Sequence, residues 1–452
     1  MGAAFRAGTL TPQQALASCL ARIEQLDPQL GAFVNLRPAA ALADAAASHE
    51  RLARGAALSA LDGVPIAIKD NLPTADLPTT WGSVAGREHR PALDELVVAR
   101  ARAAGLVIVG KTNVPEFTLE GYTHNALVGT TRNPWDPRLT PGGSSGGSVA
   151  AVASGMVPLA LGTDGGGSTR RPVGYTGLVG LKPSIGAIAR EHALPPLLLD
   201  FEVVGPIART MSDLRLLFDS LAGPHAADPA SFAAVGAART LPERLRVLYV
   251  PTLDDAPVDP AIAAACAAGA RELTALGHQV TVGAFPLDLS ALNANWPRIG
   301  QIGLAWLFAQ HPAWRQGAGD PYVAMSEQGA ACPASMLWQT LEVAMQLRRD
   351  VAHLFRHIDL IAMPSAAAMP WPAEQTHPPQ IAGRLVGPRG HAIFTGWVNA
   401  AGIPGLTIPV ADAGLLPIGL QLIGPFGSDA ALLALGDALQ KQTGRVWCWP
   451  DL

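Results

Sequence analysis

The sequence predicts an α/β fold in which helices cover a largely buried sheet. Hydrophobic residues make up 49% of the 452 residues and charged residues only 15%, which favours an extensive buried core. Short apolar runs that are typical of buried strands also alternate with helical patterns. The strand-like runs are 64–68, 106–109 and 158–161, and the helical patterns cover 94–104 and 149–154.

Two helix starts can be recognised from their capping residues. Thr11 is a good N-cap, Pro12 occupies the first helical position, and Gln14 completes a capping box. An apolar face continues from this start, and we expect Pro28 to end the helix. A Thr in the N-cap position likewise predicts a helix over 210–221.

The composition changes between about 225 and 385, where Pro and Ala are frequent. Aromatic residues cluster in this segment: Trp296, Trp306, Phe308, Trp314 and Trp338. Apolar runs like those of sheet strands return over 394–410 and 417–423, and the absence of a repeat of 20–50 residues argues against a solenoid. We therefore expect one domain over 1–452, with a core of about 60–222, a variable Trp-rich segment of about 225–385, and a return to the core over about 390–452.

Charge and hydropathy argue against several classes of partner. The formal net charge is −4 and no basic stripe is present, so nucleic acid and anionic membranes are not expected partners. The N-terminus has no apolar segment of the secretory type. The most apolar stretch, 149–162, is interrupted by Ser, Gly and Pro and is shorter than the roughly 20 residues that span a bilayer. We expect a cytoplasmic protein.

Neither a metal site nor a disulfide framework is expected. The four cysteines lie far apart and form no CxxC pair, which favours buried free thiols: Cys19, Cys266, Cys332 and Cys448. His353 and His357 lie four residues apart on a predicted helix over 348–358, but no Glu follows the first His as a metalloprotease motif requires. No cofactor is indicated.

Two familiar motif patterns match the sequence, but the local structure that each motif requires is not expected here. Residues 105–112 match the phosphate-loop pattern, yet the four variable positions are Leu, Val, Ile and Val, which favour a strand over a loop. Residues 142–146 match G-x-S-x-G, but the Pro-rich segment before them cannot form the strand that a nucleophile elbow needs. The α/β-hydrolase interpretation remains as a weaker alternative.

A Gly-rich loop over 162–172 is a better candidate for a catalytic site than either of these motifs. Three consecutive glycines precede Ser168, and such a loop can turn several backbone N–H groups toward one point and form an anion-binding nest. The alternative is a flexible turn with an incidental Ser. A second Gly/Ser-rich segment, 142–148, lies between core elements, and Lys69 ends the buried strand 64–68, where a lysine ordinarily extends to solvent.

These stretches, with several others, resemble the amidase signature family over nearly the whole chain. The matching stretches are G-V-P-I-A-I-K-D-N around Lys69, the T-x-N segment over 123–136, G-G-S-S-G-G-S at 142–148, the Gly-rich loop through 183, G-P-I-A-R-T at 205–210, and the segments 394–410 and 416–425. The resemblance implies a large mixed, mostly parallel central sheet with helices on both faces. It also implies a hydrolase that cleaves carbon–nitrogen bonds.

The resemblance further implies a role for individual residues. Lys69 would be the general base, Ser144 the bridging serine after a cis peptide bond, and Ser168 the nucleophile of an acyl-enzyme mechanism. The remaining implied residues are the oxyanion-hole glycines Gly165, Gly166 and Gly167 and the supporting residues Ser145, Asp164 and Arg170. Candidate substrate-pocket residues are Tyr122 and Thr123 at the T-x-N segment, and Tyr175, which stands where the family usually has a small or apolar residue. Because a lysine of ordinary pKa is charged at neutral pH, burial must lower the pKa of Lys69 before its amine can accept a proton.

The substrate implied by the resemblance is a small-molecule amide, anilide or carbamate. The general character of the chain resembles the aryl-acylamidase and urethanase-like group, and the Trp-rich segment could supply an apolar aromatic pocket or ordinary core packing. An alternative is an amidotransferase-type subunit that releases ammonia for transamidation. A non-catalytic relative of the family is a third. We expect a monomer or a homodimer.

Overall fold

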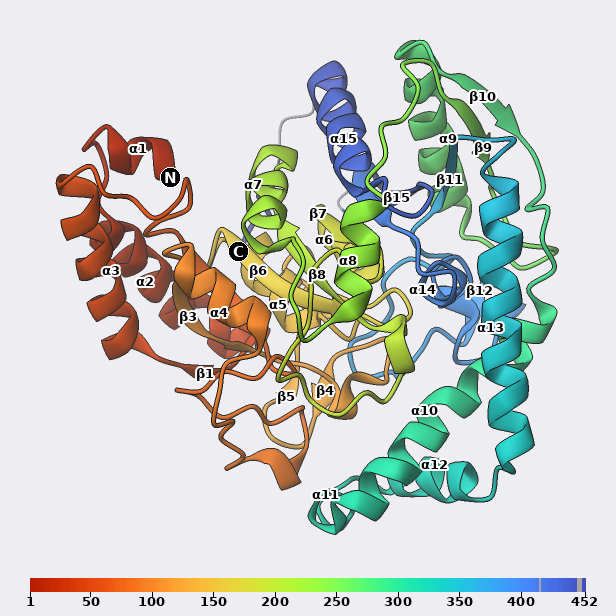
Figure 1. Ribbon diagram of the computed structural model, residues 1–452, viewed down its shortest axis with the longest axis horizontal. Coiled ribbons are helices and arrows are strands. Elements are labelled where there is room, and N and C mark those ends of the chain that lie inside the picture. The colour runs from red at the N-terminus through yellow and green to blue at the C-terminus, as the bar shows by residue number, and fades with distance from the viewer. Residues whose placement is uncertain (414–415, 445–448) are drawn as a thin grey trace.

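The structure is a computed structural model that describes residues 1–413, 416–444 and 449–452. In this part of the chain the central feature is an 11-stranded sheet with the order β1-β3-β2-β6-β8-β7-β14-β15-β11-β9-β10 (Figure 1). Its strands are β1 (Phe33–Leu36), β2 (Pro65–Lys69), β3 (Val107–Thr112), β6 (Leu159–Asp164), β7 (Val179–Lys182), β8 (Val203–Ala208), β9 (Arg246–Tyr249), β10 (Gln279–Val282), β11 (Leu360–Pro364), β14 (Gly405–Ala413) and β15 (Leu416–Ile423). Two short hairpins lie outside it, β4 (His124–Asn125) with β5 (Gly129–Thr130) and β12 (Gln380–Ile381) with β13 (Arg384–Leu385).

Parallel and antiparallel pairings occupy different parts of the sheet. β2 pairs in parallel with β3 and β6, and β9 pairs in parallel with β10 and β11. The pairings that join these two blocks, and the edge pairing of β1 with β3, are antiparallel. The predicted large mixed sheet is therefore confirmed, with its parallel pairing concentrated in these two blocks.

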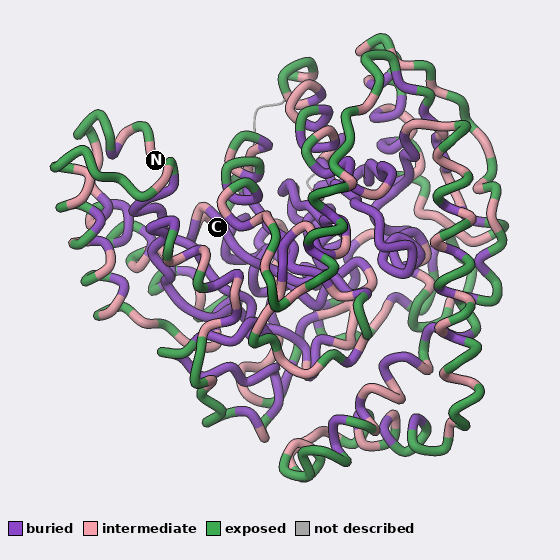
Figure 2. Tube along the Cα trace, in the orientation of Figure 1, coloured by how far each residue is buried: buried purple, intermediate pink, exposed green. Residues whose placement is uncertain are grey.

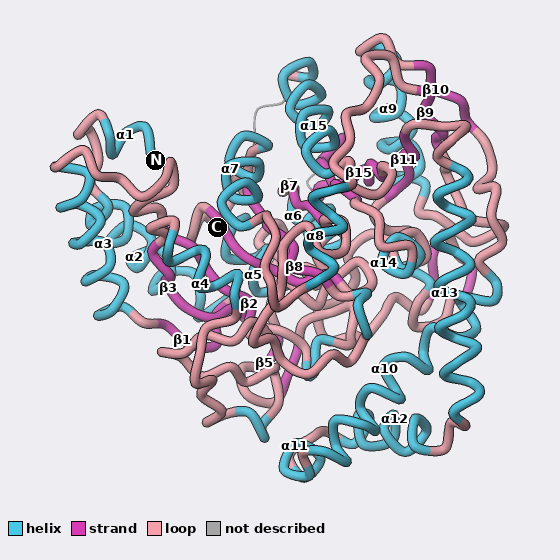
Figure 3. Tube along the Cα trace, viewed as in Figure 1, coloured by secondary structure: helices cyan, strands magenta, loops and turns pink. Residues whose placement is uncertain are grey.

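Helices cover both faces of the sheet (Figures 1 and 3). Alternate side chains along each strand point to opposite faces, and here both sets are apolar, so each face is buried under helices. Ile66 and Ile68 of β2 pack in one apolar cluster with α4, α7, α9 and α15, whereas Ala67 packs with α2, α3 and α5. The helices are α1 (Gly2–Arg6), α2 (Pro12–Leu30), α3 (Pro38–Ala53), α4 (Leu96–Ala103), α5 (Gly146–Ala153), α6 (Arg170–Thr176), α7 (Met211–Leu221), α8 (Pro229–Gly236), α9 (Pro260–Ala275), α10 (Ser290–Gln310), α11 (Pro312–Gln316), α12 (Asp320–Ala330), α13 (Ala334–Leu354), α14 (Gly396–Ala400) and α15 (Asp429–Thr443).

The predicted capping box of α2 is confirmed, but the predicted end of this helix is wrong. The Thr11 side chain accepts a hydrogen bond from the Gln14 backbone, and the Gln14 side chain accepts one from the Thr11 backbone. The helix continues through Pro28 to Leu30 and ends at Gly31, which has φ 60°. A proline in the last turn removes only one backbone hydrogen bond, whereas a glycine in the left-handed conformation turns the chain out of the helix.

The apolar run over 394–410 predicts strand throughout, and this prediction is only half right. Its first part forms helix α14, and the strand β14 begins at Gly405. The helix is buried on all sides, so its five residues carry no alternation of apolar and polar positions that would separate a helix from a strand. The helix predicted over 348–358 is the end of the longer α13, which stops at Leu354.

The Trp-rich middle segment contributes both to the sheet and to its surroundings. Its strands β9, β10 and β11 extend one end of the central sheet, while α10, α12 and α13 project beside it (Figure 1). Trp296 of α10 is buried, whereas Trp338 of α13 is 71% exposed, so only part of the aromatic cluster serves as core. Figure 2 shows buried residues concentrated in the sheet and exposed ones along the outer sides of these helices. Among the described helices, none combines the length and apolarity needed to cross a membrane.

Candidate active site

The parallel pairing of β2 with β6 brings the two predicted catalytic segments to one edge of the sheet. Lys69 is the last residue of β2, and the Gly-rich loop follows Asp164, the last residue of β6. Because parallel strands run in the same direction, their carboxyl ends meet at the same edge. The loop that carries Ser144 precedes α5, which packs against β6, β2 and β3.

Lys69 is fully buried and held by two residues. Its Nζ lies 2.8 Å from Ser144 Oγ and donates to Thr163 Oγ1 at 2.9 Å and to the Thr163 carbonyl at 3.3 Å. Burial lowers the pKa of Lys69 to about 7, although the negative charges of Glu202 and Asp164 oppose this shift. At neutral pH a substantial fraction of the amine is therefore uncharged and able to accept a proton.

The serine loop brings Ser144 and Ser145 against the Gly-rich loop. The peptide bond between Gly143 and Ser144 is cis. The Ser145 backbone N–H donates to the Ser168 carbonyl at 3.2 Å, and the Ser145 hydroxyl donates to the Thr163 carbonyl at 3.2 Å. Ser145 therefore fastens the two loops to each other through its backbone and through its side chain.

Ser168 is turned toward a cavity rather than toward the relay. Its residue is 8% exposed and lines a cavity of about 140 Å3, and its hydroxyl makes no hydrogen bond with any residue that the structure describes. The link from Lys69 to Ser144 is thus formed, whereas the link from Ser144 to Ser168 is not. Proton transfer along the predicted relay requires the Ser168 hydroxyl to come within hydrogen-bond distance of Ser144 Oγ.

The Gly-rich loop wraps around the carboxylate of Asp164. The backbone N–H groups of Gly167, Thr169 and Arg170 donate to the two carboxylate oxygens at 2.7, 3.2 and 3.3 Å. The prediction that Gly167 supplies an oxyanion donor is therefore corrected, because its N–H already has a partner. Gly165 and Gly166, which line the cavity with Ser168, retain that expected role.

Gly167 itself is required by both its conformation and its surroundings. Its φ of 108° is a backbone angle that residues with a side chain rarely adopt. A β-carbon at this position would also overlap the side chains of Thr395 and Arg171.

A buried network behind the loop joins it to the C-terminal part of the chain. The Arg170 guanidinium donates to both Asp164 oxygens at 2.9 Å and to Asn399 and Gln421, and Asn399 donates to the Asp164 carbonyl at 2.7 Å. Burial alone would raise the pKa of Asp164, but Arg170 and Asn399 hold it well below its ordinary range. Sequence reasoning does not single out Asn399 or Thr163, although both lie within stretches that carry the resemblance.

The three predicted pocket residues do not line the Ser168 cavity. Thr123 is buried and donates to the Gly142 carbonyl at 2.8 Å, while the Tyr122 backbone lies against Gly143. Tyr175 is buried against Trp371, with ring centroids 6.1 Å apart. These residues support the serine loop from behind. Of the aromatic cluster expected to form a pocket, Trp296 lines the cavity.

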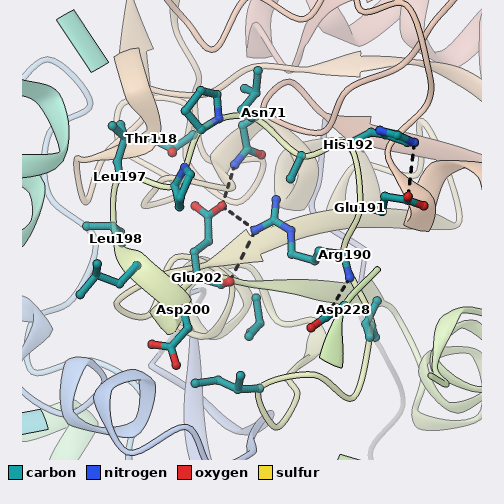
Figure 4. A pocket seen from close by; sticks show the side chains of 18 of the residues that line it. Asn71, Thr118, Arg190, Glu191, His192, Leu197, Leu198, Asp200, Glu202 and Asp228 are labelled. Atoms are coloured by element: carbon teal, nitrogen blue, oxygen red, sulfur yellow. Dashed lines mark hydrogen bonds and ion pairs between the residues drawn. The ribbon is translucent and has the colours of Figure 1, made fainter. Parts of the chain in front are cut away.

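A larger cavity of about 500 Å3 lies beside the first and shares three of its lining residues: Thr118, Leu119 and Leu198. Figure 4 shows Glu202 between Asn71 and Arg190 in this cavity. The Glu202 carboxylate accepts from Arg190 at 3.1 Å and from the Thr163 hydroxyl at 3.4 Å. The same Thr163 hydroxyl accepts from Asn71 at 3.0 Å and from Lys69, so the second cavity reaches the environment of the buried amine.

Within the described part of the chain, neither a metal-binding cluster nor a cysteine lies at this site. The described residues contain no group of three or more His, Cys, Asp or Glu side chains placed to hold a metal ion. Cys19 and Cys266 are buried free thiols, and Cys332 is a half-buried one. Cys448 lies outside the described residues.

Comparison with known proteins places these residues in a family. The Amidase family model matches residues 14–433. The chain is 34% identical to a glutamyl-tRNA(Gln) amidotransferase subunit from Chloroflexus aggregans, over 99% of this chain and 96% of that protein. Among solved structures it is similar to a bacterial aryl acylamidase (TM-score 0.88, 27% identity, 98% and 96% of the two chains) and to a peptide amidase bound to chymostatin (0.83, 26%, 100% and 98%). This chain belongs to the amidase signature family.

Proposed function

We propose that this protein hydrolyses amide-type carbon–nitrogen bonds of small molecules, with Ser168 as nucleophile, Ser144 as proton bridge and Lys69 as general base. One observation carries the proposal. A fully buried lysine amine lies 2.8 Å from a serine hydroxyl, and burial lowers its pKa to about 7. A buried lysine with only a structural role would be stabilised as the charged form by an ion pair. A general base must instead be uncharged so that its amine can accept a proton.

In the proposed mechanism, the Ser168 hydroxyl first turns to within hydrogen-bond distance of Ser144 Oγ. Lys69 takes the proton of Ser144 as Ser144 takes that of Ser168, and the Ser168 oxygen attacks the carbonyl carbon. The developing oxyanion is held by backbone N–H groups of the loop at Gly165, Gly166 and Ser168. The proton returns through Ser144 to the departing amine, leaving an acyl-enzyme that water then hydrolyses by the same relay.

Substitution of Ser168 and Lys69 tests this assignment. We expect Ser168→Ala and Lys69→Met each to lower kcat by at least about a thousandfold on 4-nitroacetanilide, with a cooperative thermal transition retained. Thr11→Ala, which removes a distant helix cap, is the matched control and should leave kcat unchanged. Turnover by Ser168→Ala at the wild-type rate would refute the nucleophile assignment.

Within this activity we propose anilides and aryl carbamates as substrates, with the protein acting as a cytoplasmic monomer or homodimer. Similarity to the aryl acylamidase structure supports anilides, whereas carbamate cleavage rests on the sequence resemblance alone. A panel of primary amides, anilides, esters and carbamates tests this choice. A strict preference for primary amides would count against it.

The similarity to amidotransferase subunits supports a second candidate function, in which ammonia released at Ser168 serves a transamidation. The net charge of −4 provides no attraction for tRNA and argues against direct contact with it. A purified chain that hydrolyses anilides without any partner would favour the amidase. Activity that appears only when a partner protein is added would favour the amidotransferase.

A further inference from the structure

The cavity beside Ser168 has an apolar side and a polar side. The apolar side is formed by Leu119, Leu198, Trp296 and Met325. The polar side is formed by Glu120, Arg171, Arg389 and His391. Four ionisable side chains around a volume of about 140 Å3 are unusual for a pocket that would bind only apolar anilides.

Arg389 holds a guanidinium at this cavity, where Glu120 is its acidic neighbour but forms no ion pair with it among the described contacts. Its side chain lies over Trp296, 5.0 Å from the ring centroid, and makes no hydrogen bond or ion pair with any residue that the structure describes. The other exposed arginine of this segment, Arg384, is by contrast hydrogen-bonded to Asp255. The planar donors of Arg389 are therefore available to a ligand, and a carboxylate matches their geometry.

Two buried neighbours of Arg389 also have unused polar atoms. Arg171 donates to Thr395 at 2.9 Å and to the Gly143 carbonyl at 3.4 Å, but its Nε has no partner within the described chain. His391 is 3% exposed, and neither of its ring nitrogens makes a hydrogen bond among the described residues. Burial and the charges of the two arginines lower the pKa of His391 well below its ordinary value, so its ring is neutral at neutral pH.

Glu120 is the acidic group of the cavity. Burial raises the pKa of Glu120 to about 7, and the charge of Arg389 opposes that rise. Arg171 and His391 line the same cavity, and burial and the charge of Glu120 raise the pKa of Tyr122 and of Tyr322, which also lies near Glu116. Below neutral pH, with Glu120 protonated, the two arginines leave the cavity net positive.

We propose that this cavity selects amide substrates that carry a carboxylate close to the scissile bond, with Arg389 as the principal binding residue. This inference rests on the proposed hydrolase function and adds its substrate class. Arg171 Nε and the His391 N–H supply further donors, and the apolar side covers the short chain between the carboxylate and the scissile carbonyl. The small volume restricts that chain to a few carbons.

Two matched substrate pairs test the proposal on either side of the scissile bond. On the acyl side, succinic mono-4-nitroanilide is compared with butyric 4-nitroanilide. On the amine side, 4-acetamidobenzoate is compared with 4-methylacetanilide. We expect kcat/KM for the carboxylated member of at least one pair to exceed that of its neutral partner by about 10- to 100-fold, as is typical of a hydrogen-bonded charge.

Variants identify the residue responsible. Arg389→Gln should reduce this preference to about threefold or less, and Arg389→Lys should retain part of it because the charge remains. Arg384→Gln, on the same exposed segment, should leave the preference unchanged. Equal turnover within both pairs, or an undiminished preference in Arg389→Gln, would overturn the proposal.

The protonation of Glu120 gives a second readout. Because an ionised Glu120 repels a carboxylate, the ratio of kcat/KM within the preferred pair should fall as the pH rises through about 7. Taking the ratio cancels the titration of Lys69, which affects both substrates alike. Glu120→Gln should make the ratio independent of pH, and a ratio that still falls in this variant would contradict the role given to Glu120.

Direct binding separates this proposal from the proposed function. In Ser168→Ala, calorimetry should detect succinamate binding at least tenfold tighter than butyramide binding, and Arg389→Gln in that background should abolish the difference. If wild type cleaves neutral anilides and this difference is absent, the substrate class is wrong and the hydrolase stands. If succinamate binds selectively and no amide is cleaved, the hydrolase assignment fails instead.

Discussion

Replacing Glu202 by Gln should shift the pH dependence of hydrolysis to lower pH. Hydrogen bonds of 2.9 and 3.4 Å meet at the Thr163 hydroxyl and keep Lys69 Nζ within about 6 Å of the Glu202 carboxylate. At an effective dielectric constant of about 20, two unit charges at this distance attract by about 2.7 kcal/mol. The ion pair of Glu202 with Arg190 at 3.1 Å offsets much of this attraction, so we expect the pKa of Lys69 to fall by about one unit.

The direction of the shift in the pH profile depends on which form of Lys69 is active. With Lys69 as the proposed general base, its ammonium form cannot accept a proton, so kcat/KM for a neutral substrate should rise with pH through the pKa of about 7. Removing a nearby negative charge destabilises the ammonium, and the rise should then occur near pH 6.

The assay is kcat/KM for 4-nitroacetanilide from pH 5 to 9 at constant ionic strength. Glu191→Gln is the matched control, because Glu191 lines the same cavity as Glu202 but makes no hydrogen bond to Thr163, Asn71 or Lys69 among the described contacts (Figure 4). A profile for Glu202→Gln that is unchanged or moves to higher pH would refute this account of the buried amine.

Three further predictions concern the framework of the site. Gly167→Ala should lower kcat by about a hundredfold or more without unfolding the protein, as checked by kinetics and circular dichroism, because its side chain would overlap Thr395. Asn399→Ala should destabilise the fold by about 2–3 kcal/mol in urea unfolding, because a buried ion pair loses a hydrogen-bond partner. Thr163→Val should lower the apparent pKa of the kcat/KM profile, because the Lys69 ammonium loses an acceptor. An unaltered value in any of these measurements would contradict the corresponding contact.

Local signals in the sequence predict much of the fold. The capping box at Thr11 and the short apolar runs around β2 and β6 are encoded by neighbouring residues, and the structure has these elements within a few residues of their expected bounds. Helix α14 cannot be recognised in this way because burial on every side removes periodicity from its sequence. The end of α2 is misplaced because Pro28 is the more conspicuous breaker, although Gly31 performs the turn.

Some residues of the candidate site can also be singled out from the sequence, and others cannot. Lys69, Ser144 and Ser168 lie in motifs whose composition is itself unusual, so sequence reasoning can single them out. The use of the Gly167 N–H depends on where one carboxylate lies in space, and the sequence alone holds no sign of that. The Ser168 cavity is likewise assembled from segments far apart in the chain, with Glu120 and Arg389 meeting only after folding, so the sequence points to neither.

The network around Asp164 also bears on when the enzyme becomes competent. Arg170 and its partner Asn399 are separated by 229 positions in the chain, and Gln421 lies still further along. A nascent polypeptide that has emerged only as far as α13 would already contain Lys69, Ser144 and Ser168, yet the loop that carries Ser168 would lack the hydrogen bonds that Arg170 donates to Asn399 and Gln421. We therefore expect a proteolytic cut ahead of Asn399 that released the downstream fragment to abolish the proposed activity, although Lys69, Ser144 and Ser168 would all remain in the chain.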